Sequence, residues 1–214
     1  MNRLQVAVVD YGMGNLRSVA NALKAVAPEV SIEVTSHPEL ISKAERVVFP
    51  GQGAMPDCIR ELDMRGLRQA VIEATREKPF FGICIGLQML FEHSEEGDVP
   101  GLGIYPGEVK RFPAEKMVDS QGNKLKVPHM GWSQVHQAGK HAMWQDIPDQ
   151  ARFYYVHSYY VDPAEAALTA ATTAYPFDYT CAIARDNVFA VQFHPEKSAE
   201  SGLQLLRNFV NWKP

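Results

Sequence analysis

Cys84 has a sequence context that would allow nucleophilic catalysis by a thiol. It is the central residue of Gly82-Ile83-Cys84-Ile85-Gly86, which has the G-x-nucleophile-x-G form of a nucleophile elbow. An apolar strand pattern precedes the motif and a helical pattern follows it, so the turn would hold the thiol at a helix N-terminus. The positive potential there favours the thiolate, which is the reactive form of cysteine. Because most free cysteines are buried packing residues, the motif alone leaves a structural role open.

His194 and Glu196 could supply the base and the orienting group that a thiol nucleophile needs. They are two residues apart at the end of an apolar strand pattern, so in an extended backbone their side chains face the same side. Pro195 lies between them and disfavours a helical turn. The pair by itself also fits an ordinary surface histidine and glutamate. Together with Cys84 it forms a candidate Cys–His–Glu triad.

A glycine loop follows the third predicted strand and could stabilise the oxyanion of an amide substrate. Gly51, Gln52 and Gly53 would present backbone N–H groups, and the N–H of Ile85, directly after the nucleophile, would be the second donor. A Pro-Gly-x-Gly sequence alone is also compatible with a plain turn. The ends of the third and fourth strands, however, fall on one edge of a parallel sheet, where such sheets bind ligands.

The elements that must position these groups alternate between strands and helices in the first half of the chain. Strand patterns over residues 5–10, 31–35, 46–49 and 80–83 alternate with helical patterns over residues 16–26, about 54–77 and 85–91. The second half has short strand patterns at residues 108–112, 124–127, 153–156, 168–173, 181–185 and 189–193, a hairpin turn at 186–187 and a final helix. We predict an α/β fold forming a single domain over residues 1–214. It has a mainly parallel central sheet flanked by helices, plus additional antiparallel strands in the C-terminal half.

The composition is that of an ordinary globular protein. The chain has 214 residues, 46% of them hydrophobic, and a formal net charge of −4, which disfavours a non-specific nucleic-acid binder. The N-terminus has no signal-peptide pattern, and no apolar run is long enough to span a membrane, so we expect a cytoplasmic protein. Three cysteines without C-x-x-C spacing indicate a reducing compartment. Cys58 and Cys181 are expected to be inert packing residues.

Two further kinds of site are not favoured by the sequence. Gly12-Met13-Gly14 follows the first strand, but the third glycine of a dinucleotide-binding loop would fall at Arg17. The seven histidines and three cysteines show no spacing typical of metal ligands. We therefore expect no cofactor and no metal.

The motifs together resemble the class I glutamine amidotransferases, or triad glutaminases. The resemblance covers essentially the whole chain, and its finer features are similar to the glutaminase subunits of imidazole glycerol phosphate synthases. Gln52 stands where those subunits usually have Val, and Ser133 where they usually have Asn. The segments that carry the resemblance are residues 82–88, 192–196, 10–16, 50–54, 128–132 and 155–159.

The resemblance implies a reaction and a set of residue roles. Cys84 would attack the side-chain carboxamide of glutamine, His194 would transfer protons, and Glu196 would hold the imidazole. The resemblance assigns substrate binding to Gln88, Ser158 and Tyr159. Ammonia would pass to a (βα)₈-barrel cyclase subunit in a heterodimer. The implied contacts with that partner are Asn15, Trp132, Tyr154 and Lys197.

Two alternatives remain at this point. The same half-reaction could serve another synthase, such as anthranilate or aminodeoxychorismate synthase, although the segment at residues 128–132 argues against it. The chain could also be a non-catalytic scaffold subunit that keeps the fold. The intact Cys84, His194 and Glu196 argue against a scaffold.

Overall fold

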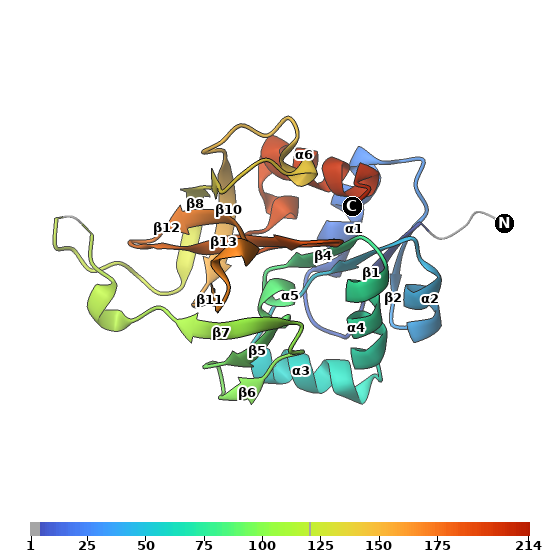
Figure 1. Cartoon of the computed structure of the whole chain (residues 1–214), viewed down its shortest axis with the longest axis horizontal. Coiled ribbons are helices and arrows are strands. Elements are labelled where there is room, and N and C mark those ends of the chain that lie inside the picture. Colours follow the sequence, from blue (N-terminus) through green and yellow to red (C-terminus); the bar gives the residue numbers. More distant parts are fainter. Residues whose placement is uncertain (1–4, 120) are drawn as a thin grey trace.

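The central strands have two apolar faces, and each face is covered. The computed structural model describes residues 5–119 and 121–214. The expectation that the N-terminus has no signal peptide therefore falls partly on residues 1–4, which lie outside the described residues. In strand β1 (Val6–Val9), Val6 and Val8 join one hydrophobic cluster, while Ala7 and Val9 join another on the opposite face. This follows from the two-residue period of a strand. Figure 1 shows helices on both sides of these strands, as a parallel sheet requires.

Five parallel strands form the half of the sheet that is nearest the predicted triad. They lie side by side in the order β2 (Ile32–Thr35), β1, β3 (Arg46–Phe49), β4 (Phe80–Ile83) and β14 (Val188–Val191). Strand β14 comes from the C-terminal part of the chain and pairs with β4 so that Val191 is opposite Ile83. The carboxyl ends of β3, β4 and β14 therefore meet at one edge.

The helices differ from the sequence prediction in three places. Helix α2 (Pro38–Lys43) was not predicted, because His37-Pro38 was expected to be only a break after the second strand. Gly66, with φ of +68°, ends the pattern predicted over residues 54–77 as one helix and divides it into two. The helix predicted over residues 85–91 is a single turn, because Phe91 begins a strand. In the described residues no helix is long and apolar enough to cross a membrane. The helices are α1 (Leu16–Val26), α2 (Pro38–Lys43), α3 (Met55–Met64), α4 (Arg68–Glu77), α5 (Ile85–Gln88) and α6 (Ala199–Asn211).

Mainly antiparallel strand pairs extend the sheet beyond β14, and antiparallel strands in the C-terminal half were predicted. The hairpin turn at Asp186-Asn187 is confirmed, since it joins β13 (Asp178–Arg185) to β14. Beyond β13 the order continues with β11 (Tyr159–Pro163), β7 (Tyr105–Arg111), β5 (Phe91–Ser94) and β6 (Val99–Pro100). These neighbours pair antiparallel except for β5 and β7, which are parallel. Strand β12 (Thr169–Ala174) pairs with β13 and with β9 (His136–Gln137). The predicted strand at residues 124–127 is wrong, because only Lys124 pairs, in an isolated bridge with Val118.

A separate two-stranded ribbon lies over the antiparallel end of the sheet. It consists of β8 (His129–Gln134) and β10 (Arg152–His157), which pair antiparallel (Figure 1). Its inner residues, such as Phe153 and Tyr155, belong to the same hydrophobic cluster as β14 and α6. The part of the chain that the structure describes also contains four short 3-10 segments: η1 (Ala114–Lys116), η2 (Ala142–Trp144), η3 (Ala166–Leu168) and η4 (Pro195–Lys197).

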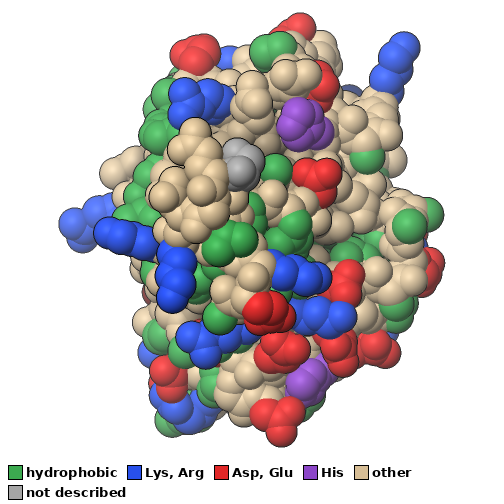
Figure 2. Space-filling model, turned by 90° about the vertical axis from the view of Figure 1, so that its left-hand side faces the viewer, with side chains coloured by type: hydrophobic (Ala, Val, Ile, Leu, Met, Phe, Trp, Pro, Cys, Tyr) green, Lys and Arg blue, Asp and Glu red, His purple; other side chains and the backbone are tan. Residues whose placement is uncertain are grey.

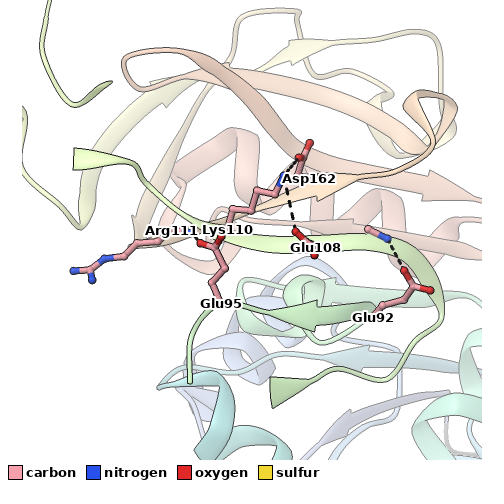
Figure 3. A network of polar contacts seen from close by, with 7 residues as sticks. Glu92, Glu95, Glu108, Lys110, Arg111 and Asp162 are labelled. Carbon is pink, nitrogen blue, oxygen red and sulfur yellow. Dashed lines mark hydrogen bonds and ion pairs between the residues drawn. The ribbon is translucent and has the colours of Figure 1, made fainter. Parts of the chain in front are cut away.

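Carboxylates on β5 and just after it bind the backbone of the neighbouring strand β7 (Figure 3). Glu95 accepts a hydrogen bond from the Arg111 N–H at 2.7 Å, and Glu92 accepts one from the Gly107 N–H at 3.1 Å. Acidic and basic side chains are intermingled on the face that Figure 2 shows. That face therefore presents no large field of a single sign, in keeping with the small net charge.

Candidate active site

Cys84 lies on a strained turn between β4 and α5. Its φ of +56° and ψ of −111° are rarely adopted by a residue with a side chain, and such a conformation costs about 1–3 kcal/mol. The Cys84 N–H donates to the Val191 carbonyl oxygen at 2.8 Å, which fixes the turn to β14. The side chain is buried but lines a cavity. The turn therefore presents the thiol at the carboxyl edge, as the elbow motif predicts.

The two glycines of the motif are needed for close packing. A Cβ at Gly86 would collide with the carbonyl oxygen of Phe49, at the end of the neighbouring strand β3. A Cβ at Gly82 would lie 2.9 Å from both the Gly86 carbonyl oxygen and the Ala190 Cβ. The sequence pattern thus reflects the tight contact of three strand ends around Cys84.

His194 and Glu196 form a buried pair just after β14. The distance from His194 Nδ1 to Glu196 Oε1 is 2.9 Å, and the side chains are 2% and 1% exposed. Because this hydrogen bond uses Nδ1, Nε2 is the ring nitrogen that can exchange a proton with another group. Nε2 has no hydrogen-bond partner among the described residues. Because β14 is next to β4, His194 and Cys84 share one edge and line the same cavity.

The electrostatics of this group favour a protonated imidazole. Burial lowers the pKa of His194, but the Cys84 thiolate and the Glu196 carboxylate outweigh burial and raise it to about 10. The imidazole is therefore protonated at neutral pH. A thiolate–imidazolium pair is the state in which a cysteine is ready to attack a carbonyl carbon.

The cavity in front of Cys84 has a volume of about 460 Å³ and contains most of the predicted site. Glu196 supports His194 from outside the cavity lining, and Gly51 is buried and does not line the cavity. The cavity is also lined by His157, which the sequence analysis did not select. The predicted residues that line it are Gln52, Gly53, Cys84, Ile85, Gln88, Ser158, Tyr159, His194 and Lys197.

Gln192 is a second residue that the sequence analysis did not select. It is fully buried, and its Nε2 lies 3.7 Å from the Cys84 Sγ. Its Oε1 accepts a hydrogen bond from Gln88 Nε2 at 2.9 Å. The sequence did offer a signal for this residue, because Gln192 is a polar residue at the end of an apolar strand pattern. A buried polar side chain needs hydrogen-bond partners, so such a glutamine is a candidate for a site.

The predicted partner contacts fall into separate groups. Trp132 on β8 and Tyr154 on β10 are opposite each other in the ribbon, with ring centroids 6.1 Å apart and Trp132 44% exposed. Lys197 is exposed at the cavity. Asn15 precedes α1 and lies outside the cavity lining. The Tyr154 carbonyl accepts a hydrogen bond from the His194 N–H at 2.9 Å, which connects the ribbon directly to the base.

The other two cysteines have environments unlike that of Cys84. Cys58 on α3 and Cys181 on β13 are fully buried, and burial raises the pKa of each thiol to about 12. Both therefore remain protonated at neutral pH.

Within residues 5–119 and 121–214, no cluster of three or more His, Cys, Asp or Glu side chains could hold a metal ion.

The chain is similar to glutamine amidotransferases in sequence and fold. It is 68% identical over 209 residues to the imidazole glycerol phosphate synthase subunit HisH of Nitrosospira multiformis, covering 98% of each chain, and 55% identical to that of Chromobacterium violaceum, again covering 98% of each. A crystal structure of a glutamine amidotransferase shares the fold, with a TM-score of 0.69 at 17% identity over 96% of this chain and 97% of that chain. The family described as class I glutamine amidotransferase matches residues 7–212. This chain therefore belongs to the class I glutamine amidotransferase family.

Proposed function

We propose that the chain is the glutaminase subunit of an imidazole glycerol phosphate synthase. The observation that carries this proposal is the strained Cys84 beside the buried His194–Glu196 pair, in one cavity. The near full-length similarity to synthase subunits supports the choice of synthase. The domain is proposed to comprise the whole of residues 1–214.

The first half of the reaction forms a thioester. The Cys84 thiolate attacks the carboxamide carbon of glutamine, and the carbonyl oxygen becomes an oxyanion. His194, holding its proton on Nε2, gives that proton to the leaving nitrogen as the C–N bond breaks. Ammonia departs and the glutamyl group remains on Cys84. Glu196 accepts from Nδ1 and stabilises the imidazolium before the transfer.

The second half returns the enzyme to its starting state. His194, now neutral, accepts a proton from water as the water oxygen attacks the thioester carbon. The C–S bond breaks, glutamate leaves, and the proton on the imidazole restores the thiolate–imidazolium pair. The cycle consumes one glutamine and one water and yields glutamate and ammonia.

Backbone N–H groups are proposed to stabilise the oxyanion. Ile85 is the first residue of α5, so its N–H is not used within the helix. The Gln52 carbonyl oxygen accepts from the Cys58 thiol at 3.8 Å, so the Gly53 N–H of the same trans peptide points to the opposite side. Both residues line the cavity with Cys84. Gly51 is proposed to give the loop its close approach to Ile85.

Gln88, Ser158 and Tyr159 are proposed to hold the substrate. Both N–H groups of the Gln88 amide are engaged, one with the Tyr159 carbonyl at 3.0 Å and the other with Gln192. Only the Gln88 Oε1 is then available to a ligand, and an oxygen acceptor suits the α-ammonium group of glutamine.

The ammonia is proposed to pass to a (βα)₈-barrel cyclase subunit in a heterodimer. Trp132, Tyr154, Lys197 and Asn15 are the proposed contacts with that subunit. Direct transfer keeps ammonia from bulk water, where it would be protonated and no longer nucleophilic. We place the reaction in the cytoplasm, whose reducing conditions preserve a free thiol such as Cys84.

A glutaminase assay with the cyclase subunit and its nucleotide ligand tests this function. The wild-type complex is expected to release glutamate, and the complex with Cys84→Ala is expected to release none above background. Cys181→Ala serves as the matched control, because its thiol is fully buried and does not line the cavity. Glutamate release by the Cys84→Ala complex would refute the assignment of Cys84 as the nucleophile. A wild-type complex without glutaminase activity would refute the proposed function.

A further inference from the structure

A buried row of hydrogen bonds connects the ribbon to the wall of the cavity. His129 Nε2 lies 2.9 Å from Ser133 Oγ, and His129 Nδ1 lies 3.0 Å from the Tyr179 hydroxyl. The same hydroxyl lies 2.9 Å from His157 Nε2, and His157 Nδ1 lies 2.8 Å from the Tyr159 carbonyl oxygen. His129, Tyr179 and His157 are each at most 6% exposed. The row crosses from β8 through β13 to the end of β10.

When both histidines are neutral, the donor and the acceptor of every hydrogen bond in the row are determined. A carbonyl oxygen can only accept, so His157 must carry its proton on Nδ1 and must accept at Nε2. The Tyr179 hydroxyl therefore donates to His157 and accepts from His129 Nδ1–H. His129 Nε2 is then an acceptor, and the Ser133 hydroxyl donates to it. One acceptor at Tyr159 thus fixes the tautomers of both rings.

The environment keeps both rings neutral. Burial lowers the pKa of His129 to about 4 and that of His157 to about 3. At the pH of a cell neither ring gains a second proton, so the direction of the row does not reverse. The aromatic neighbours hold the ring planes, since His129 stacks on Tyr175 with centroids 3.9 Å apart.

The row continues from Tyr159 to the sulfur of Cys84. The Tyr159 carbonyl also accepts from Gln88 Nε2, so the Gln88 amide must present its nitrogen there. Its second N–H donates to Gln192 Oε1, which turns the Gln192 nitrogen toward Cys84 Sγ at 3.7 Å. Each amide orientation follows from the previous one. Gln192 is therefore a donor to the sulfur, which suits a thiolate.

We propose that His129, Tyr179 and His157 are positioning residues that hold the Tyr159 carbonyl and, through Gln88, aim the Gln192 amide at the Cys84 sulfur. This proposal rests on the glutaminase function proposed above. The Tyr179 hydroxyl is the central member, because it alone joins the two histidines. Without it, His157 Nε2 loses its hydrogen-bond donor, and the wall of the glutamine cavity loses its support.

The first test compares two tyrosine variants in the complex with the cyclase subunit. Tyr179→Phe removes the central hydroxyl but keeps the ring in the aromatic cluster. It is expected to raise KM for glutamine about tenfold, the value of roughly one net hydrogen bond, with kcat changed less. Tyr175→Phe is the matched control, because its hydroxyl donates to the Lys126 carbonyl outside the row, and it is expected to leave KM unchanged. Equal KM values in both variants and wild type would overturn the proposal.

A second test measures the histidine tautomers directly, in the wild type and in Tyr179→Phe. Nitrogen-15 NMR of histidines labelled only in this chain, within the complex, is expected to show His157 and His129 neutral and protonated on Nδ1 between pH 6 and 8. Tyr179→Phe is expected to change the nitrogen shifts of both rings. An Nε2–H tautomer at His157 in the wild type would overturn the proposal.

Ser133 provides a rescue experiment at the far end of the row. Ser133→Ala removes the donor to His129 and is expected to raise KM a few-fold, whereas Ser133→Asn offers an amide donor and is expected to retain the wild-type KM. Ser133→Asn behaving like Ser133→Ala would argue against the donor role. A wild-type complex that lacks glutaminase activity would refute the proposed function, and the NMR result would then decide on the row separately.

Discussion

The carboxyl edge of the parallel strands and the β8–β10 ribbon contribute to the same cavity by different means. At the edge, backbone geometry holds Cys84 on a turn fixed by strand pairing and glycine contacts. The ribbon acts through side chains, since His129 and His157 reach Tyr179 on the main sheet. The geometry of the edge therefore depends on close packing. The contribution of the ribbon depends on which group donates and which accepts in each hydrogen bond. Substitutions in the two regions should differ in kind as well as in size.

The largest expected effect is on the chemistry at the edge. His194→Asn removes the proton donor and base, and it is expected to lower kcat for glutamine hydrolysis by about 10⁴-fold with the fold retained. Glutamate release by the complex with the cyclase subunit measures the loss. His93→Asn is the matched control, because His93 forms a similar pair with Asp98 at 2.9 Å but on the exposed surface. A residual rate within tenfold of wild type would contradict the role of His194.

The packing of the edge gives the next effect. Gly86→Ala places a Cβ against the Phe49 carbonyl oxygen and is expected to cost about 3 kcal/mol of unfolding free energy, as for other overpacked cores. Urea denaturation followed by circular dichroism measures it. Gly139→Ala, which has no atoms within 4 Å of its new Cβ, is expected to change stability by less than about 1 kcal/mol. Equal costs at both positions would contradict the packing account.

The ribbon surface is expected to affect association and leave the chemistry intact. Trp132→Ala removes a 44% exposed aromatic side chain and is expected to weaken binding to the cyclase subunit about tenfold or more, as for an interface aromatic. Isothermal titration calorimetry measures Kd. Met64→Ala, at a 74% exposed position at the end of α3, is the control and is expected to leave Kd unchanged. An unchanged Kd for Trp132→Ala would remove this residue from the proposed interface.

A smaller and more specific effect concerns the charge of His194. Its pKa of about 10 lies above the ordinary 6.5, so the pair stabilises the fold fully below about pH 6.5 and loses that contribution as pH rises through 10. Cys84→Ser removes the negative sulfur and is expected to lower the pKa of His194. NMR titration of the imidazole checks the direction. An unchanged or higher value in Cys84→Ser would contradict the thiolate–imidazolium pair.

The sequence predicts the edge well because its signals are local. Gly82 to Gly86 specify the elbow within five residues, and His194 and Glu196 are two residues apart. The ribbon is less visible in the sequence because its contacts are distant along the chain. Tyr179 is 50 residues from His129 and 22 from His157, so neither spacing nor periodicity indicates their contact. The prediction also made the single-turn α5 too long. Met89 and Leu90 continue the apolar pattern, and such a pattern is compatible with a helix or a buried loop.

The central claim is that Cys84 alone among the three cysteines is the nucleophile, and covalent labelling tests it most directly. The complex is treated at neutral pH with a glutamine analogue that carries an electrophile at the carboxamide position, and the peptides are examined by mass spectrometry. The account predicts one adduct per chain, on Cys84, with protection by glutamine and no adduct on Cys58 or Cys181. Labelling of Cys58 or Cys181 instead of Cys84, or labelling of Cys84 that glutamine does not slow, would contradict it.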